Sequence, residues 1–342
     1  MSAAEPVPAE PVPGHPAAED PAAEDAAAGG STGRGRWIGL ATAAVTFLAI
    51  IFLAGEVADI PAAFGPVHGE DWLWLAPAIA FAGAGFAANA LTLSGAVDAP
   101  LPPLRTLGLE LGRAFTTMAT PGGVGSFALT VRFLQRRGID VAAASTSAAL
   151  TSVGGLVVDL LALLVGGVLS ASMLAGDNLQ SKAGSDAWLF LVAVVAVAAA
   201  VAVVWHVPRL RNRVVPQLHK ALSMVRAVVH RPRKAARLFL GQALLLATQV
   251  GCLYCTLALV HQHANLALLL ALVVLATMAQ RAVPIPGALG APEAILVTTL
   301  TGVGLNGSAV VAAALTYRLL TYWLPAIPGF VAIRWLRHRG AL

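Results

Sequence analysis

Charged side chains are scarce in this chain of 342 residues. Only 11% of the residues are Asp, Glu, Lys or Arg, while 58% are hydrophobic. A soluble domain usually has about 25% charged and about 45–50% apolar residues. So few charges could not cover the surface of a soluble protein of this length. That class is therefore excluded, and lipid must be the solvent for most of the chain.

Cysteines and catalytic motifs are also few or missing. The two cysteines, Cys252 and Cys255, both lie in one apolar run, which excludes a disulfide framework and favours small core residues over redox chemistry. The sequence has no P-loop, no kinase motif set and no H-E-x-x-H. We therefore expect no enzyme activity, no cofactor and no metal site.

Residues 1–35 differ in composition from the rest of the chain. They are rich in Ala, Pro, Glu and Asp and contain P-A-A-E-D twice in tandem, at 16–20 and 21–25. Such a segment buries too little apolar surface to offset its ordering entropy, so a disordered acidic tail is predicted. The long acidic stretch before the first apolar run is not typical of a signal peptide.

Apolar segments of membrane-spanning length recur along residues 36–338, which predicts a polytopic all-α membrane domain. A spanning helix needs about 20 mostly apolar residues. Six segments meet this requirement: 37–55, 72–93, 141–170, 187–206, 238–260 and 307–333.

The placement of Lys and Arg predicts the orientation. Loop 207–237 carries basic residues and no acid, and Arg334, Arg337 and Arg339 follow the last segment. Such regions stay on the cytoplasmic side. Both termini are therefore predicted in the cytoplasm, with the chain in a bacterial cytoplasmic membrane. The net charge of +5 reflects these loops and does not indicate a nucleic-acid partner.

Two further apolar segments are interrupted by Pro and Gly. Segment 104–131 is broken at 121–125 (P-G-G-V-G), and segment 266–304 at 284–290 (P-I-P-G-A-L-G). The predicted orientation requires each segment to enter and leave by one face of the membrane. We therefore predict two re-entrant helical hairpins. The alternative is that the two broken segments cross the membrane fully, which would give eight spans instead of six.

The two breaks are related by an internal repeat. A shift of 165 residues places Gly122 on Gly287 and Gly125 on Gly290, and it also aligns A-A-L-T at 148–151 with the same letters at 313–316. Three spans separate the hairpins, so the second half (238–333) is predicted to be inverted relative to the first (37–206). Interrupted segments at matching positions of two halves indicate a transporter's binding site. The alternative is that they only kink packed helices.

Six ionisable residues are predicted within the membrane, where each costs at least ~2.5 kcal/mol and needs a partner or a polar cavity. They are Glu110, Arg113, Asp159, Arg281, Glu293 and Arg318.

For three of these residues, simple pairing and a functional role are both open. Glu110 and Arg113 are three residues apart on one helix face, which predicts either an ion pair or a functional site. For Asp159, a hydrogen bond to a Ser or Thr of a neighbouring helix and a functional role are both open.

The charges near the second break favour a functional site. Glu293 falls in the first helical turn after Gly290, and the broken stretches at Gly122, Gly125, Gly287 and Gly290 place helix N-termini, which attract anions, at membrane depth. Arg318 is predicted to hold either a phosphate or the Glu293 carboxylate. Arg281 is predicted to do the same, or to extend towards the membrane surface.

The run 120–138 resembles the bacterial flippase-like membrane domain that forms the N-terminal region of lysylphosphatidylglycerol synthetases. The run 284–293 resembles that family's P-x-P-G-G-x-G-x-x-E signature, and L-T-Y-R at 315–318 and W-L-P at 323–325 resemble its closing helix. Ala288 replaces the second Gly of the signature, and the first motif has Ala128 where the second has Glu293. A symmetric mechanism with two carboxylates is therefore not expected.

The resemblance implies translocation of a polar lipid or a lipid-linked intermediate, with membrane lipids that carry anionic or phosphate headgroups as partners. No soluble synthetase domain follows Leu342, so aminoacyl transfer is not expected. Two alternatives remain: a secondary transporter of a small solute driven by protons or sodium, and a membrane scaffold for a lipid-modifying enzyme that depends on the basic loop 207–237.

Overall fold

The fold is known from a computed structural model, which describes part of the chain. The described residues are 69–120, 123–176, 223–224, 226, 228, 230–282 and 290–342, without the side chains of 119, 167–176 and 282. All of them belong to one compact unit, Leu48–Leu342. The predicted tail 1–35, the predicted spans 37–55 and 187–206, and most of loop 207–237 lie outside the described residues.

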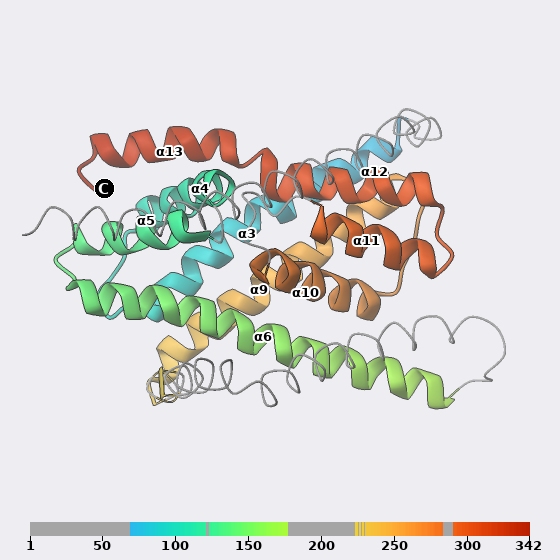
Figure 1. Cartoon of the computed structure of the whole chain (residues 1–342), viewed down its shortest axis with the longest axis horizontal. Helices are drawn as coiled ribbons and strands as arrows, with labels where there is room; N and C mark the ends of the chain where they lie inside the picture. The colour runs from blue at the N-terminus through green and yellow to red at the C-terminus, as the bar shows by residue number, and fades with distance from the viewer. Residues whose placement is uncertain are drawn as a thin grey trace, which may run out of the picture. The chain divides into compact units, whose positions relative to one another are not determined.

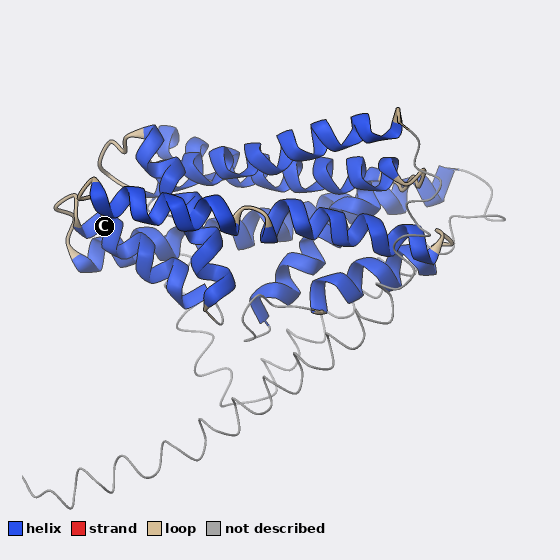
Figure 2. Cartoon of the chain, turned by 90° about the horizontal axis from the view of Figure 1, so that it is seen from above, coloured by secondary structure: helices blue, strands red, loops and turns tan. Residues whose placement is uncertain are grey.

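Within these residues the chain is helical and contains no strand (Figure 2). The elements are the 3-10 helix η1 (Asp71–Trp74), α3 (Leu75–Ala96), α4 (Pro103–Ala119), α5 (Val124–Gln135), α6 (Val141–Gly176), α9 (Pro232–Leu259), α10 (Leu266–Ala282), α11 (Ala291–Gly302), α12 (Gly307–Arg318), the π-helix η4 (Leu319–Trp323) and α13 (Ala326–His338).

Four helical stretches of the described chain are long and apolar enough to cross a membrane. They are Asp71–Ala96, Val141–Gly166, Pro232–Leu259 and Gly307–His338. Each coincides with one of the predicted spanning segments. The all-helical membrane class predicted from the composition is thereby confirmed.

Helices α3 and α9 form the tightest pair, and they run antiparallel. Near one end, a Cβ atom on Gly95 of α3 would lie 2.8 Å from the carbonyl oxygen of Lys234, at the start of α9. At the other end, the Oδ2 atom of Asp71 lies 3.0 Å from the Nε2 atom of His261, the second residue after α9. A Cβ on Gly241 would lie 2.6 Å from the backbone nitrogen of Thr92. The two backbones touch because these positions have no side chain.

Two short helical hairpins pack against this pair. Helices α4 and α5 contact each other, as do α10 and α11, and Figure 1 shows the first hairpin beside α13 and the second beside α12. Helix α4 begins beside the C-terminal end of α3, and α5 ends just before the start of α6. Helix α10 begins and α11 ends where Gln262 accepts a 3.2 Å bond from the backbone nitrogen of Asn306. The two hairpins therefore open at opposite ends of the helix assembly.

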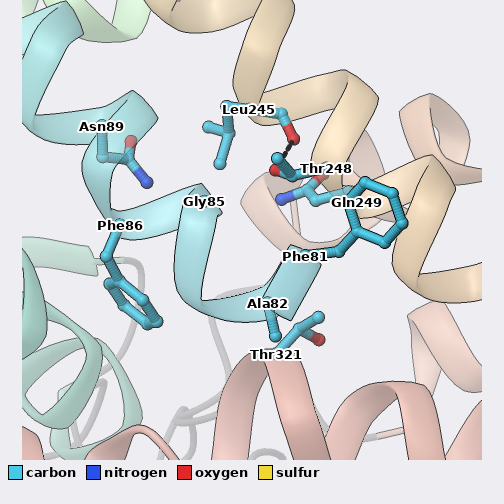
Figure 3. Close-up of a pocket in the computed structure, with 9 residues that line it drawn as sticks. All are labelled: Phe81, Ala82, Gly85, Phe86, Asn89, Leu245, Thr248, Gln249 and Thr321. Atoms are coloured by element: carbon cyan, nitrogen blue, oxygen red, sulfur yellow. Dashed lines mark hydrogen bonds between the residues drawn. The ribbon is translucent and has the colours of Figure 1, made fainter. Parts of the chain in front are cut away.

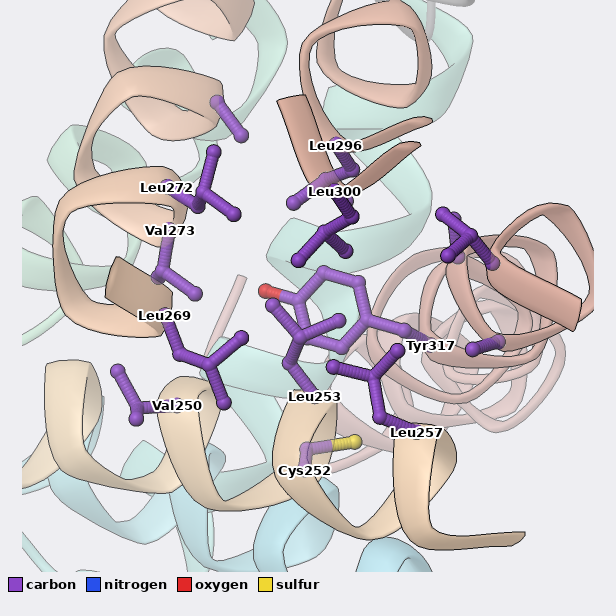
Figure 4. Packing of buried hydrophobic residues seen from close by; sticks show 14 of the residues in the cluster. Val250, Cys252, Leu253, Leu257, Leu269, Leu272, Val273, Leu296, Leu300 and Tyr317 are labelled. Atoms are coloured by element: carbon purple, nitrogen blue, oxygen red, sulfur yellow. The ribbon is translucent and has the colours of Figure 1, made fainter. Parts of the chain in front are cut away.

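An apolar core holds the second hairpin against α9 and α12. Leu253 and Leu257 of α9, Leu272 of α10 and Leu300 of α11 are almost fully buried around the ring of Tyr317 (Figure 4). Cys252 and Cys255 belong to the same cluster as free, buried thiols, which confirms the prediction that they are core residues.

A second apolar cluster closes the end of the molecule that carries most of the described arginines. Leu109 of α4, Phe133 and Leu134 of α5, and Leu336 of α13 are fully buried there. Arginines flank this cluster, and we call this region the Arg-rich end. Its described arginines include Arg105, Arg132, Arg136, Arg137, Arg231, Arg233, Arg237, Arg334, Arg337 and Arg339.

Candidate functional site

A cavity of about 490 Å³ lies between the first hairpin, α6 and the end of α10. Its lining contains two arginines, Arg113 of α4 and Arg281 of α10, which come from different hairpins. The remaining lining residues are Gly123, Val124, Ser126, Phe127, Thr130, Ala148, Thr151 and Ser152. Two guanidinium groups and several hydroxyl groups therefore line this cavity, together with apolar side chains.

Arg113 is held by an acid of its own helix. Its Nη1 donates a 2.7 Å hydrogen bond to Glu110 Oε2, as predicted from their spacing. Glu110 is buried, and in the described structure neither its Oε1 nor the Arg113 Nε has a hydrogen-bond partner. The pair is therefore not fully satisfied by hydrogen bonds within the described structure.

Arg281 reaches across from α10 to α6. Its Nη1 donates a 2.7 Å bond to Asp159 Oδ2, and the Arg281 side chain is 46% exposed while that of Asp159 is only 10% exposed. Arg281 also passes over Gly155, where an added Cβ would lie 3.3 Å from its Nη2. The predicted hydrogen bond of Asp159 to a Ser or Thr is thus replaced by an ion pair. Residues 122 positions apart in sequence form it, so the spacing gave no sign of it.

The start of α5 is shaped by two glycines. Gly123 has φ of 70°, which a non-glycine residue adopts only with strain. An added Cβ on Gly125 would lie 2.6 Å from the side-chain oxygen of Thr120, and the Gly125 amide donates a 3.0 Å bond to that oxygen. These glycines allow the chain to turn sharply at the tip of the hairpin and to place the first turn of α5 on the cavity.

Three hydroxyl groups of the lining donate to their own helices. Ser126 donates to the Gly123 carbonyl, Thr130 to the Ser126 carbonyl and Thr151 to the Ala148 carbonyl. Their oxygens keep lone pairs that accept hydrogen bonds from a ligand. The sequence analysis did not select these hydroxyls. The repeated A-A-L-T at 148–151 was the available signal for Thr151.

Glu293 and Arg318 form a closed, buried pair. The Arg318 Nε donates a 2.6 Å bond to Glu293 Oε1, and the side chains are only 4% and 5% exposed, respectively. Glu293 Oε2 also accepts a 2.9 Å bond from the Gly290 amide and so caps α11. The Arg318 guanidinium lies 4.4 Å from the centre of the Tyr322 ring. Of the two roles predicted for Arg318, the structure has the Glu293 ion pair.

The structure thus divides the predicted site residues between two places. Arg113 and Arg281 meet on the cavity, with Gly125 at the N-terminal turn behind it and Asp159 as the partner of Arg281. Glu293, Arg318 and Gly290 form the second group, away from the lining of that cavity. Gly122 and Gly287 lie outside the described residues.

A smaller cavity of about 80 Å³ lies between α3, α9 and the π-helix η4. Figure 3 shows Asn89 of α3, Gln249 of α9 and Thr321 of η4 around it, with the rings of Phe81 and Phe86 at its margin. Its polar lining consists of uncharged amides and hydroxyls, so it is suited to a few water molecules rather than to an anion.

The charge of the large cavity can be tested by thiol labelling. Ser152→Cys, on a Cys252→Ala, Cys255→Ala background, is expected to react at least about tenfold faster with an anionic methanethiosulfonate than with a cationic one. The reason is that the guanidinium groups of Arg113 and Arg281 line the cavity and are more exposed than the carboxylates that pair with them. The measurement is the labelling rate in detergent. Leu161→Cys, on the exposed face of the same helix, is the control and should show no such preference. Equal rates at position 152 would contradict an anion-attracting cavity.

The apolar helices, the buried ion pairs and the polar cavity define the chain as a polytopic helical membrane protein. Residues 36–329 match the family described as the lysylphosphatidylglycerol synthase TM region, and the chain belongs to that family. This match confirms the resemblance seen in the two glycine-containing motifs. A search of curated proteins found no match to this chain.

Proposed function

We propose that the chain is a flippase-like transporter that moves a polar lipid or a polyprenyl-linked intermediate across the bacterial cytoplasmic membrane. The observation that carries this proposal is the cavity of about 490 Å³ that Arg113 and Arg281 line from two different hairpins. Guanidinium groups bind phosphate through several hydrogen bonds in a fixed geometry. A phosphate held by both arginines would connect the two halves of the molecule.

The helix boundaries support an inverted repeat. A shift of 165 residues places α4 on 268–284, close to the 266–282 of α10, and places α5 on 289–300, close to the 291–302 of α11. The same shift places Asp71–Ala96 on 236–261, close to the 232–259 of α9. The antiparallel packing of α3 and α9 is the relation that an inverted repeat requires.

The helix lengths favour re-entrant hairpins over pairs of full spans. Helices α5 and α11 have 12 residues each. At 1.5 Å per residue each is about 18 Å long, which is too short for a hydrocarbon core of about 30 Å. Helix α9, with 28 residues, is about 42 Å long and crosses it. The hairpins open at opposite ends, so their tips would meet from opposite faces of the membrane.

The partner carboxylates suit a site that must release its ligand. Glu110 and Asp159 neutralise Arg113 and Arg281 when no phosphate is bound. An arriving phosphate replaces these carboxylates, and their return favours its release. The Glu293–Arg318 pair then acts as the gate that fixes the second hairpin to α12.

Reconstitution tests this proposal. Proteoliposomes with acyl-labelled fluorescent phosphatidylglycerol should show faster movement between leaflets than protein-free vesicles. Arg113→Gln and Arg281→Gln should each slow it at least about tenfold, because a lost charge-assisted hydrogen bond is worth about 1.5–3 kcal/mol. Arg233→Gln, exposed on α9 and outside the cavity, is the control. Wild-type rates in both cavity variants, each with an unchanged thermal unfolding profile, would contradict the proposal.

A secondary transporter of a small anion is the second candidate, because the two arginines of the cavity would also bind a free anion. The same vesicles distinguish the two functions. Uptake of labelled inorganic phosphate driven by a proton or sodium gradient, without lipid movement, would favour the solute transporter.

A further inference from the structure

A third cavity, of about 460 Å³, lies at the Arg-rich end between the C-terminal end of α3, the loop that follows it, the start of α4 and the start of α9. It shares no lining residue with the cavity of Arg113 and Arg281. We propose that this third cavity binds the headgroup of an anionic phospholipid from the adjacent leaflet, with Arg237 as the phosphate ligand. Its lining residues are Ala90, Leu91, Ser94, Ala99, Pro100, Leu101, Pro103, Thr106 and Arg237.

Helix length places Arg237 at the depth of lipid phosphates. Helix α9 spans 28 residues from Pro232, about 42 Å, so it exceeds a hydrocarbon core of about 30 Å by about 6 Å at each end. Arg237 is five residues beyond Pro232, about 8 Å along the helix. Its guanidinium therefore lies near the boundary between acyl chains and headgroups, where basic pockets between helices bind anionic lipids.

The neighbouring charges leave Arg237 available to a ligand. Asp98, in the loop beside the cavity, accepts ion pairs from both Arg231 and Lys234. Its negative charge is therefore neutralised and does not oppose an anion. Among the described residues no carboxylate forms an ion pair with Arg237, whose side chain is exposed. The cavity thus carries one uncompensated positive charge.

The walls match the rest of a phospholipid headgroup. Leu91, Pro100, Leu101 and Pro103 give an apolar surface beside which the glycerol backbone and first methylenes can lie. The hydroxyl of Ser94 donates to the Leu91 carbonyl, and that of Thr106 to the Pro102 carbonyl. Their oxygens remain acceptors for a hydroxyl of the ligand. A headgroup that carries hydroxyls beside its phosphate, such as phosphatidylglycerol, fits this lining better than one that ends in a quaternary amine.

The two helices α3 and α9, which both contribute to the lining, are in close backbone contact beside the cavity. Gly95 of α3 lies so close to α9 that an added Cβ would be 2.8 Å from the Lys234 carbonyl oxygen and closer still to the Leu238 backbone nitrogen. Two helices in backbone contact cannot shift inward to fill the space. The cavity is therefore formed before the lipid arrives, and little ordering opposes binding.

Lipid titration of the full chain in a non-ionic detergent tests this site. Native mass spectrometry would measure the dissociation constant of the tightest-bound dioleoyl phosphatidylglycerol. Arg237→Gln should weaken it about tenfold, as expected for loss of a charge-assisted hydrogen bond. Arg233→Gln, exposed on the same helix but outside the lining, is the matched control and should bind as the wild type does. Dioleoyl phosphatidylcholine should bind more weakly to all three proteins.

The titration is repeated in a protein that carries both Arg113→Gln and Arg281→Gln, which separates this site from the proposed translocation cavity. In that background Arg237→Gln should still weaken the binding of phosphatidylglycerol about tenfold. Equal weakening by Arg233→Gln would show general attraction to a basic surface and would overturn the proposal. So would wild-type affinity in Arg237→Gln. Displacement of phosphatidylglycerol by millimolar inorganic phosphate would show a site for free anions and would also overturn the lipid assignment.

Discussion

Arg318→Met alone is expected to destabilise the protein by about 3–5 kcal/mol, because it leaves the Glu293 carboxylate buried without its partner. Glu293→Gln alone should also be strongly destabilising, since the Arg318 guanidinium would remain buried with its charge unpaired. The combined Glu293→Gln, Arg318→Met variant should recover much of the loss, because replacing both charges removes the need to bury an uncompensated one. The measurement is the midpoint of thermal unfolding in detergent for the four proteins of this double-mutant cycle.

The contact geometry explains why this pair should dominate. Both side chains are almost completely buried, and each makes a further contact: Glu293 with the Gly290 amide and Arg318 with the Tyr322 ring. The exposed pair of Asp98 with Arg231 is the comparison, where Asp98→Asn should change stability by less than about 1 kcal/mol. Additive losses in the double variant would show that Glu293 and Arg318 act independently and would contradict a single locked pair.

The second large effect is expected where α3 meets α9. Gly95→Ala and Gly241→Ala should each destabilise the protein by about 3 kcal/mol, at the upper end of the range for overpacking. The added methyl groups would lie less than 3 Å from backbone atoms of the facing helix, and a backbone cannot move aside as a flexible side chain can. Thermal unfolding and the yield of monodisperse protein after extraction measure the effect.

Gly83→Ala provides a matched control on the same helix, because an added Cβ there meets no atom within 4 Å. Alanine is the better helix former, so this variant should be unchanged or more stable by up to about 1 kcal/mol. If Gly95→Ala were as well tolerated as Gly83→Ala, the backbone contact between α3 and α9 would not be a feature of the folded protein.

These two features have different functions in the proposed transport cycle. The contact between α3 and α9 is a fixed axis, because it is made by backbone atoms and allows little change of separation. The Glu293–Arg318 pair joins the second hairpin to α12, and an ion pair has two discrete states, made and broken. Any separation of the second hairpin from α12 therefore requires this pair to break.

Several elements were predictable because they depend on local composition. The apolar runs predicted the helices Asp71–Ala96, Val141–Gly166, Pro232–Leu259 and Gly307–His338, since a lipid-facing helix must be apolar along its length. The breaks after α4 and before α11 were predicted from Pro and Gly. The Glu110–Arg113 pair followed from a spacing of three residues on one helix. The glycine motifs also indicated the family that the match over 36–329 confirms.

Contacts between helices were predictable only in part: the Glu293–Arg318 pair was one of two alternatives for Arg318, and the Asp159–Arg281 pair was not foreseen. The Asp159–Arg281 pair joins residues that lie 122 positions apart, and nothing in the neighbourhood of either residue specifies the other. The cavity lined by Arg113 and Arg281 could not be predicted either, because it forms only where the first hairpin, α6 and α10 pack together.

The sequence by itself determined that the chain is a membrane protein, where its four long apolar helical stretches lie, and which buried charges need partners. Burial in lipid makes an unpaired charge too costly to keep, so the need for partners is visible in the chain. The sequence named Glu110 as a partner for Arg113 and Glu293 as one of two partners for Arg318, but only the tertiary structure joined Asp159 to Arg281, because that pairing depends on how α6 and α10 pack. For the same reason only the fold places Arg281 on the cavity and Arg318 in a closed pair, although both are arginines near the same break.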